Sequence, residues 1–180
     1  MARIPLPTRD SLPEALRTRW DRTAGGGAML DIQRLFLVNP EIDLNARKVW
    51  RASGLSDRAR EIVILRAAYT QASRYEWHQH VRIARGVGLP DADINAVRSS
   101  PEAACFSPDE RALLAYVDEL AAHARPSDES FAGIRVGRTD AEVVGVTYLI
   151  TLYFQLAKLM AVMDLEPESA FVGWELPAPA

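Results

Sequence analysis

The stretch "SRYEWHQH", residues 73–80, gathers several side chains that can take part in proton transfer. Glu76 and His80 are four residues apart, so on a helix they lie on one face, a single turn from each other. A carboxylate that orients an imidazole commonly prepares the histidine to act as a general acid or base. His78 is two positions from His80, about 200° around a helix, and therefore points away from it. The stretch favours acid–base chemistry over a metal site built from both histidines.

Glu76 also has an ordinary structural interpretation. Ser73 and Glu76 match the capping box S/T-x-x-E, in which a hydroxyl and a carboxylate satisfy two backbone amides at a helix start. The same pattern begins at three other positions: Ser11, Ser107 and Thr139. His80, for its part, could be a partly buried histidine whose nitrogens are satisfied within the protein. Local pattern alone leaves a cap and a site open for this stretch.

A second candidate region is the preceding segment, residues 56–71, whose interior is apolar. Glu61 stands at the edge of the apolar run, where it is either exposed and paired with Arg58 one turn earlier or partly buried. Arg66 is flanked by apolar residues and could reach an anion. This segment could therefore supply a carboxylate and a cation to a site.

A third candidate is the stretch Tyr148–Phe154 of the long apolar segment 143–163. Tyr148, Thr151 and Gln155 recur at spacings of three and four, which places a polar stripe on one helix face. Such a stripe could line a pocket or form a contact between helices. The segment itself is interpreted as a buried core or interface helix, because polar residues interrupt it; a membrane span is the alternative.

Helical periodicity runs through the chain, and no convincing apolar/polar alternation of strands is present. Caps and Pro or Gly stops predict helices near residues 11–22, 28–37, 42–53, 57–71, 74–85, 91–98, 108–123, 128–135 and 140–163. Ser56 and Ser127 are expected to be simple N-caps. This predicts an all-α single domain, a bundle of eight or nine helices. Within it we expect an N-terminal helical segment (1–55), a core (56–165) and a C-terminal tail (166–180).

Composition narrows the classes of partner. The 180 residues fit one domain, and the net charge of −3, with arginines dispersed among acids, predicts no nucleic-acid partner and no membrane surface. The first 20 residues have no apolar run typical of a secretory signal. The single cysteine, Cys105, cannot form an internal disulfide or a dithiol pair, so we expect a cytoplasmic protein.

Residues 60–97, "REIVILRAAYTQASRYEWHQHVRIARGVGLPDADINAV", resemble the carboxymuconolactone decarboxylase/alkylhydroperoxidase D-like family. The resemblance rests on a glutamate, a hydrophobic helix, the string Tyr-Glu-Trp-x-x-His, a Gly-Leu turn and a short acidic helix. It implies the all-α bundle of the alkylhydroperoxidase D (AhpD) type. It also implies a homo-oligomer, a trimer or hexamer with a dimer as the alternative, whose sites lie near subunit contacts.

The hydroperoxidase branch of this family has the pattern Glu-x11-Cys-x2-Cys-x3-His. Its glutamate and histidine positions fall on Glu61 and His80, and its two cysteine positions fall on Ser73 and Glu76. Without the sulfur pair the redox cycle has no carrier, and Cys105 lies outside the pattern. The resemblance therefore argues against a thiol peroxidase and for the branch that lacks the cysteine pair.

Enzymes of the decarboxylase branch use acid–base catalysis, without a cofactor, on a carboxylic acid that contains a lactone ring. By this resemblance His80 is the expected general acid or base, and Glu76 and Glu61 are its partners. Candidate substrate-binding residues are Arg66, Ser73, Tyr75 and Trp77, with Arg82 as a further cation. We expect a cofactor-independent lyase that acts on a small carboxylated cyclic or aromatic-derived compound and uses no metal. The alternatives are a peroxide-reducing antioxidant protein and a non-catalytic small-molecule-binding protein.

Overall fold

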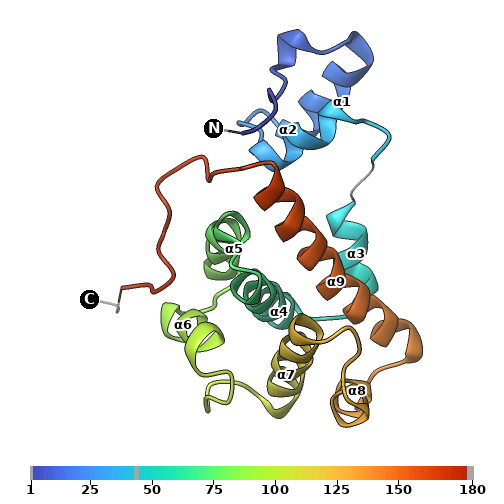
Figure 1. The fold of residues 1–180 in the computed structure, drawn as a ribbon, viewed down its shortest axis with the longest axis vertical. Coiled ribbons are helices and arrows are strands. Elements are labelled where there is room, and N and C mark those ends of the chain that lie inside the picture. Colours follow the sequence, from blue (N-terminus) through green and yellow to red (C-terminus); the bar gives the residue numbers. More distant parts are fainter. Residues whose placement is uncertain (1, 43–44, 178–180) are drawn as a thin grey trace.

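The computed structural model describes residues 2–42 and 45–177 (Figure 1). Within this part of the chain there are nine α-helices, one short 3-10 helix (η1, Arg9–Ser11) and no strand. The α-helices are α1 (Glu14–Ala24), α2 (Asp31–Val38), α3 (Ala46–Ala52), α4 (Asp57–Thr70), α5 (Arg74–Gly86), α6 (Asp91–Ser99), α7 (Pro108–Ala122), α8 (Asp128–Arg135) and α9 (Asp140–Val162). The prediction of an all-α single domain is confirmed.

Helix α4 is the centre of the bundle. It packs against α5, α6, α7 and α9, and nearly every side chain from Ala59 to Ala68 is buried. A helix that is apolar on all sides is stable only when other helices surround it, which is the position that α4 occupies in Figure 1. Since α5 follows α4 after a short turn, the two candidate segments of the sequence lie side by side.

Helix α9 crosses the bundle and packs against α3 and α4. By length and composition it could span a membrane, but 56% of its most apolar window is buried inside the protein, so α9 is a core helix. At Gly145 the backbone of α3 comes so close that an added Cβ would lie 2.0 Å from the carbonyl oxygen of Ala52. Only glycine permits this approach of α3 to α9.

Most of the predicted helix starts are confirmed. The side chains of Ser56 and Ser127 cap α4 and α8, and Ser107 and Thr139 form the expected capping boxes with the glutamates three residues later. The box predicted at Ser11 is wrong. Because Leu12 precedes a proline it is extended, and α1 begins only at Glu14, while the Ser11 hydroxyl donates to the carbonyl of Thr8 in η1.

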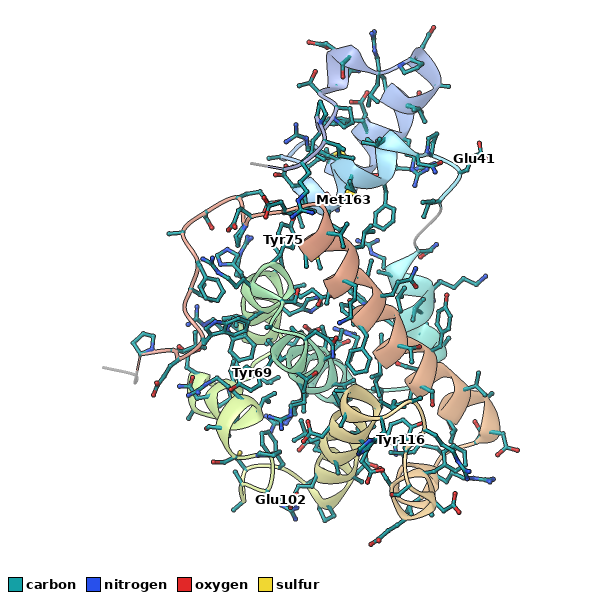
Figure 2. All side chains as sticks on the ribbon, viewed as in Figure 1. Glu41, Tyr69, Tyr75, Glu102, Tyr116 and Met163 are labelled. Atoms are coloured by element: carbon teal, nitrogen blue, oxygen red, sulfur yellow. The ribbon has the colours of Figure 1, made fainter. Side chains whose placement is uncertain are left out.

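Segments near both ends of the described chain pack against the ends of α9 and α5. Near the N-terminus, the amide of Arg3 donates to the carbonyl of Met163 just after α9. The segment after α9 then runs along α5, where Trp77 Nε1 donates to the carbonyl of Gly173 and the Trp174 ring packs on Trp77. Tyr75 lies where α5 faces the N-terminal helices (Figure 2), and its hydroxyl accepts from the amide of Ile32. The N-terminal helices and the tail therefore cover one end of α5.

Candidate active site

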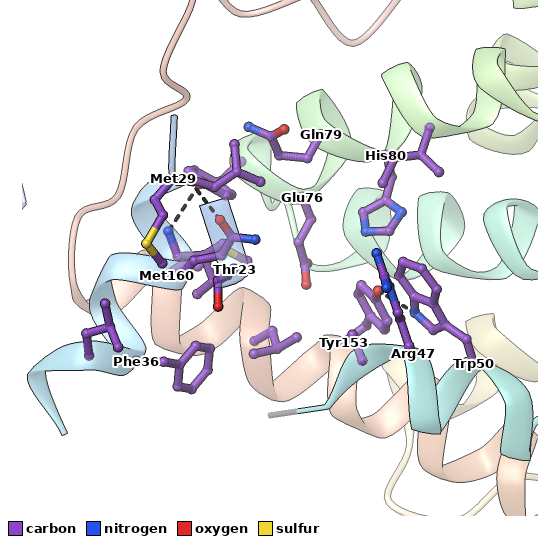
Figure 3. Close-up of a pocket in the computed structure, with 18 of the residues that line it drawn as sticks. Thr23, Met29, Phe36, Arg47, Trp50, Glu76, Gln79, His80, Tyr153 and Met160 are labelled. Carbon is purple, nitrogen blue, oxygen red and sulfur yellow. Dashed lines mark hydrogen bonds between the residues drawn. The ribbon is translucent and has the colours of Figure 1, made fainter. Parts of the chain in front are cut away.

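A cavity of about 440 Å³ lies between the N-terminal helices, α5 and α9 (Figure 3). Its wall is mostly apolar and includes Met29, Ile32, Phe36, Trp50, Leu156 and Met160. The titratable or polar side chains that reach it include Arg19, Arg47, Glu76, Gln79, His80 and Tyr153. An apolar chamber with a few polar groups is the usual form of a small-molecule site.

His80 and Glu61 form a hydrogen-bonded pair at this cavity. His80 Nδ1 lies 2.7 Å from Glu61 Oε2, and both side chains are buried. Because the carboxylate can only accept, Nδ1 carries the proton, which leaves Nε2 as the nitrogen that can exchange a proton with a ligand. The other carboxylate oxygen of Glu61 accepts from Arg60 Nε at 2.9 Å. The predicted pairing of Glu61 with Arg58 is wrong, since Arg58 pairs with Asp93 and Glu110 instead.

Glu76 reaches the same cavity and does not cap its helix. Its side chain is 4% exposed, and neither carboxylate oxygen has a hydrogen-bond partner among the described residues. The capping box expected at Ser73 does not form, because the Ser73 amide already donates to the carbonyl of Ala68 at 2.8 Å. Burial raises the pKa of Glu76 to about 8. At neutral pH this residue is mostly a neutral carboxylic acid, able to donate a hydrogen bond to a ligand.

Tyr153 and Trp50 fix the wall beside His80. The Tyr153 ring meets the imidazole edge-on with 5.1 Å between ring centroids, and its hydroxyl accepts from Trp50 Nε1 at 3.0 Å. Arg60 stacks on Trp50 at 4.6 Å from the ring centroid. Burial raises the pKa of Tyr153 well above its usual range, so the phenol stays protonated and can donate to a ligand.

The four candidate substrate-binding residues are not all at the cavity. Tyr75 lines it, whereas Arg66, Ser73 and Trp77 are absent from its wall. Arg66 makes two hydrogen bonds to Asp118 and two to backbone carbonyls at the end of α6, which uses most of the N–H donors of its guanidinium. Trp77 is completely buried in an apolar cluster that includes Leu65 and Val81. These contacts hold helices together and leave no group directed at a ligand in the cavity.

His78 points away from His80, as the helical spacing predicts. Its Nδ1 accepts from the amide of Val172, and its Nε2 lies 3.0 Å from the Ser169 hydroxyl. Burial lowers its pKa, which suits a neutral ring that binds the tail. The stripe of Tyr148, Thr151 and Gln155 lies on the exposed face of α9, away from the cavity.

Several residues of the cavity carry no signal in the sequence. Arg47, Trp50, Phe36 and Tyr153 come from three helices that are far apart in the chain, and none belongs to a spaced motif. Only the meeting of α2, α3 and α9 brings them together. In residues 2–42 and 45–177, no group of three His, Cys, Asp or Glu side chains could hold a metal ion.

Comparison with known proteins gives a family match over the middle of the chain. Residues 42–119 match the model of the carboxymuconolactone decarboxylase family, and this region contains Glu61, Glu76 and His80. Over residues 42–119 the resemblance found in the sequence is confirmed. A comparison with curated protein sequences gave no match.

Solved structures show the same fold over nearly the whole chain. An uncharacterized peroxidase-related protein from Silicibacter sp. TM1040 superposes with a TM-score of 0.80 at 13% identity, covering 96% of this chain and 94% of the other. An uncharacterized peroxidase-related protein with an alkylhydroperoxidase AhpD core, from Ralstonia eutropha JMP134, gives 0.76 at 17% identity and 98% of both chains. A cysteine-to-alanine variant of the debrominase Bmp8, in complex with 2,3,4-tribromopyrrole, gives 0.73 at 14% identity, covering 94% and 95%. The fold is therefore AhpD-like.

Proposed function

We propose that this protein is an acid–base enzyme of the carboxymuconolactone decarboxylase type that needs no cofactor. Its expected substrate is a small carboxylated cyclic or aromatic-derived compound, and its reaction is a decarboxylation or a related lyase step. The observation that supports this most is that one apolar cavity is lined by His80, which is bonded to the buried Glu61, and by Glu76, whose carboxyl group has no hydrogen-bond partner among the described residues. A buried polar group without a partner is rare in native proteins, and a ligand is a direct explanation of it.

The proposed roles follow from the protonation of each group. Glu61 holds Nδ1–H of His80 and stabilises the imidazolium that forms when Nε2 takes a proton. Glu76, mostly protonated at neutral pH, donates to the oxygen on which negative charge develops in an enolate-like intermediate. The apolar walls limit the access of water, which strengthens both interactions. His80 and Glu76 are thus the proposed proton-transferring pair.

Turnover of small ring carboxylates tests this proposal. A panel of such compounds and a cell metabolite extract are incubated with the protein, and loss of substrate is followed by mass spectrometry. His80→Ala and Glu76→Gln are expected to lower the rate at least about 100-fold, the usual contribution of a general acid or base. His123→Ala removes an exposed histidine outside the cavity and is the matched control. Folded variants of His80 and Glu76 that keep full turnover would exclude this mechanism.

A peroxide-reducing antioxidant is the second candidate, because two of the structural relatives are described as peroxidase-related. The single cysteine argues against it: Cys105 is exposed and does not line the cavity. Peroxide reduction that survives Cys105→Ser would favour this candidate.

A non-catalytic binding protein is the third candidate, and it predicts ligand binding without any product. The debrominase relative, with its bound halogenated ring, supports a small ring compound as the ligand in either case.

The proposal extends to assembly and compartment. Along its outer side α9 exposes Val144, Tyr148 and Val162, which are 68%, 58% and 57% exposed, and this face carries few charges. We infer that a second copy of the chain covers it in a homo-oligomer, a trimer, hexamer or dimer. The cytoplasm is the proposed compartment, in keeping with the single free cysteine.

A further inference from the structure

The charges that line the cavity are unbalanced. Two arginines reach it, Arg19 from α1 and Arg47 from α3, and Glu76 is the one carboxyl group on its described wall. Burial keeps Glu76 largely protonated at neutral pH, so it does not offset them. Glu61 lies behind His80, where Arg60 and His80 already occupy its two oxygens. Arg47 is therefore a positive charge at the cavity that Glu76 does not offset at neutral pH, and such a charge attracts an anion.

Arg47 is the cation free to bind that anion. Arg19 already donates to the carbonyl of Pro40. Among the described residues, Arg47 has no hydrogen bond, ion pair or ring contact, although Asp and Glu are abundant in the chain. Figure 3 shows its side chain extending from α3 in the direction of His80. It is exposed to solvent, so it can capture a ligand on entry.

The surroundings of Arg47 indicate which anion fits. Trp50, one helical turn further along α3, lines the same cavity, and its ring is held in place by Tyr153 and Arg60. A fixed indole beside a guanidinium offers an apolar face for a ring and a planar pair of N–H donors for a carboxylate. A phosphate or other compact anion would leave the Trp50 and Phe36 walls without contact. The combination matches a flat ring compound that carries a carboxylate.

We propose that Arg47 is the carboxylate-binding residue of this cavity and that Trp50 supports the ring of the same ligand. This inference rests on the proposed function for the identity of the site and names the residue that recognises the substrate. It replaces Arg66, whose guanidinium is committed to Asp118 and α6, in the role of the cation.

The test measures binding and needs no turnover. The probes are 2-naphthoate and its neutral amide, 2-naphthamide, titrated calorimetrically into the folded full-length protein at pH 7. We expect 2-naphthoate to bind more tightly than the amide. Arg47→Gln should weaken 2-naphthoate about 10-fold, the usual value of one charge-assisted hydrogen bond, and leave the amide unchanged. Arg47→Lys keeps the charge and loses the planar pair of donors. Its affinity for 2-naphthoate should lie between those of the wild type and Arg47→Gln.

Arg51→Gln is the matched control, since Arg51 is an exposed arginine on the same helix that does not line the cavity. Its affinity for 2-naphthoate should equal that of the wild type. The proposal is overturned if wild type does not bind 2-naphthoate, if it binds both probes equally, or if Arg47→Gln binds 2-naphthoate as tightly as Arg51→Gln does. If the ring carboxylates of the turnover panel bind through Arg47 and none of them is turned over, this inference stands and the proposed lyase activity is contradicted.

Discussion

Glu76 shows how one sequence pattern leads to two different outcomes. Glu110 and Glu142 stand at the third position of S/T-x-x-E strings and accept a hydrogen bond from the amide of their N-cap residue. Glu76 stands in the same string, but the amide of Ser73 is already bonded to Ala68, so its carboxyl group turns into the cavity. The pattern describes what the residues could do locally. The turn before α5, in which Ala72 has a φ of 51°, determines whether Glu76 caps the helix or reaches the cavity.

A pH-dependent stability follows from the burial of Glu76. Below pH 4.5 the carboxyl group is protonated in both the folded and the unfolded chain, and it causes no penalty. As the pH rises from 4.5 to about 8, the unfolded chain ionises while the folded one keeps its proton, so stability falls. Glu76→Gln removes this loss. Relative to wild type, we expect it to gain stability over this range, by on the order of 5 kcal/mol at pH 9, measured by urea unfolding.

Glu142→Gln is a control in which the effect of the substitution on stability should have the opposite sign. The backbone and hydroxyl of Thr139 lower the pKa of Glu142, so its contribution to stability is present above pH 4.5 and is lost as the pH falls below that value. This variant should be less stable than wild type at pH 7 and equal to it in acid. A Glu76→Gln protein whose stability runs parallel to wild type from pH 4.5 to 9 would mean that the native Glu76 is solvated.

The sequence predicts the contact between Glu61 and His80 better than it predicts the other side chains that line the cavity. Glu61 and His80 come from consecutive helices joined by a short turn, so spacing and resemblance were enough to pair them. The predicted roles of these residues remain a proposal. Arg66 was a reasonable candidate cation from its apolar neighbours, but its partner Asp118 lies on α7, which local pattern cannot reveal. Arg47 had no such neighbours to single it out.

At the level of helices, most starts and ends were predictable to within a few residues, whereas the contacts between helices were not. Caps, prolines and glycines act over three or four residues, so nine helices could be read from the chain. The position of α3 depends on α9, which is about 90 residues further along the chain. Gly145 makes that contact close, and a glycine inside an apolar helix gives no hint of which helix it meets. Trp50 and Arg47 reach the cavity through this contact.

Gly145→Ala should therefore disturb the site from a distance. The new Cβ would lie 2.0 Å from the carbonyl oxygen of Ala52, so α3 must move away from α9. We expect a loss of unfolding free energy of about 1–3 kcal/mol, typical of overpacking, together with weaker ligand binding because Trp50 moves with α3. Thermal and urea unfolding measure the first effect, and calorimetric titration of 2-naphthoate measures the second.

Gly133→Ala is the matched control, since Gly133 is also inside a helix. There an added Cβ meets its nearest heavy atom, the Cβ of Ala112, at 3.8 Å, which is ordinary contact. Replacing a helical glycine without a clash should raise stability by about 0.5–1 kcal/mol and leave binding unchanged. If the two alanine variants lose stability equally, the close approach of α3 to α9 is not what Gly145 provides.

At the scale of the whole molecule, the tail and α2 meet α5 beside the cavity. Glu168 in the tail accepts hydrogen bonds from the Tyr75 hydroxyl, Gln79 Nε2 and the amide of Asp31 at the start of α2. Tyr75 and Gln79 line the cavity, so one carboxylate joins the tail, α2 and α5 beside it. The matched region, residues 42–119, contains Glu61, Glu76 and His80 but neither α2 nor the tail. The shape of the cavity is therefore a property of the whole chain.

The outer face of α9 leads to a prediction about assembly. Val144, Tyr148 and Val162 are exposed along a helix whose other side is core, and such a face is stable in water when another surface covers it. In sedimentation-velocity runs we expect the wild type as a homo-oligomer and Tyr148→Glu, which would bury a charge in the contact, as smaller species. Val38→Glu makes the same kind of change at an exposed valine of α2 and should keep the wild-type mass. A monomeric wild type, or a Tyr148→Glu protein of unchanged mass, would contradict assembly through α9.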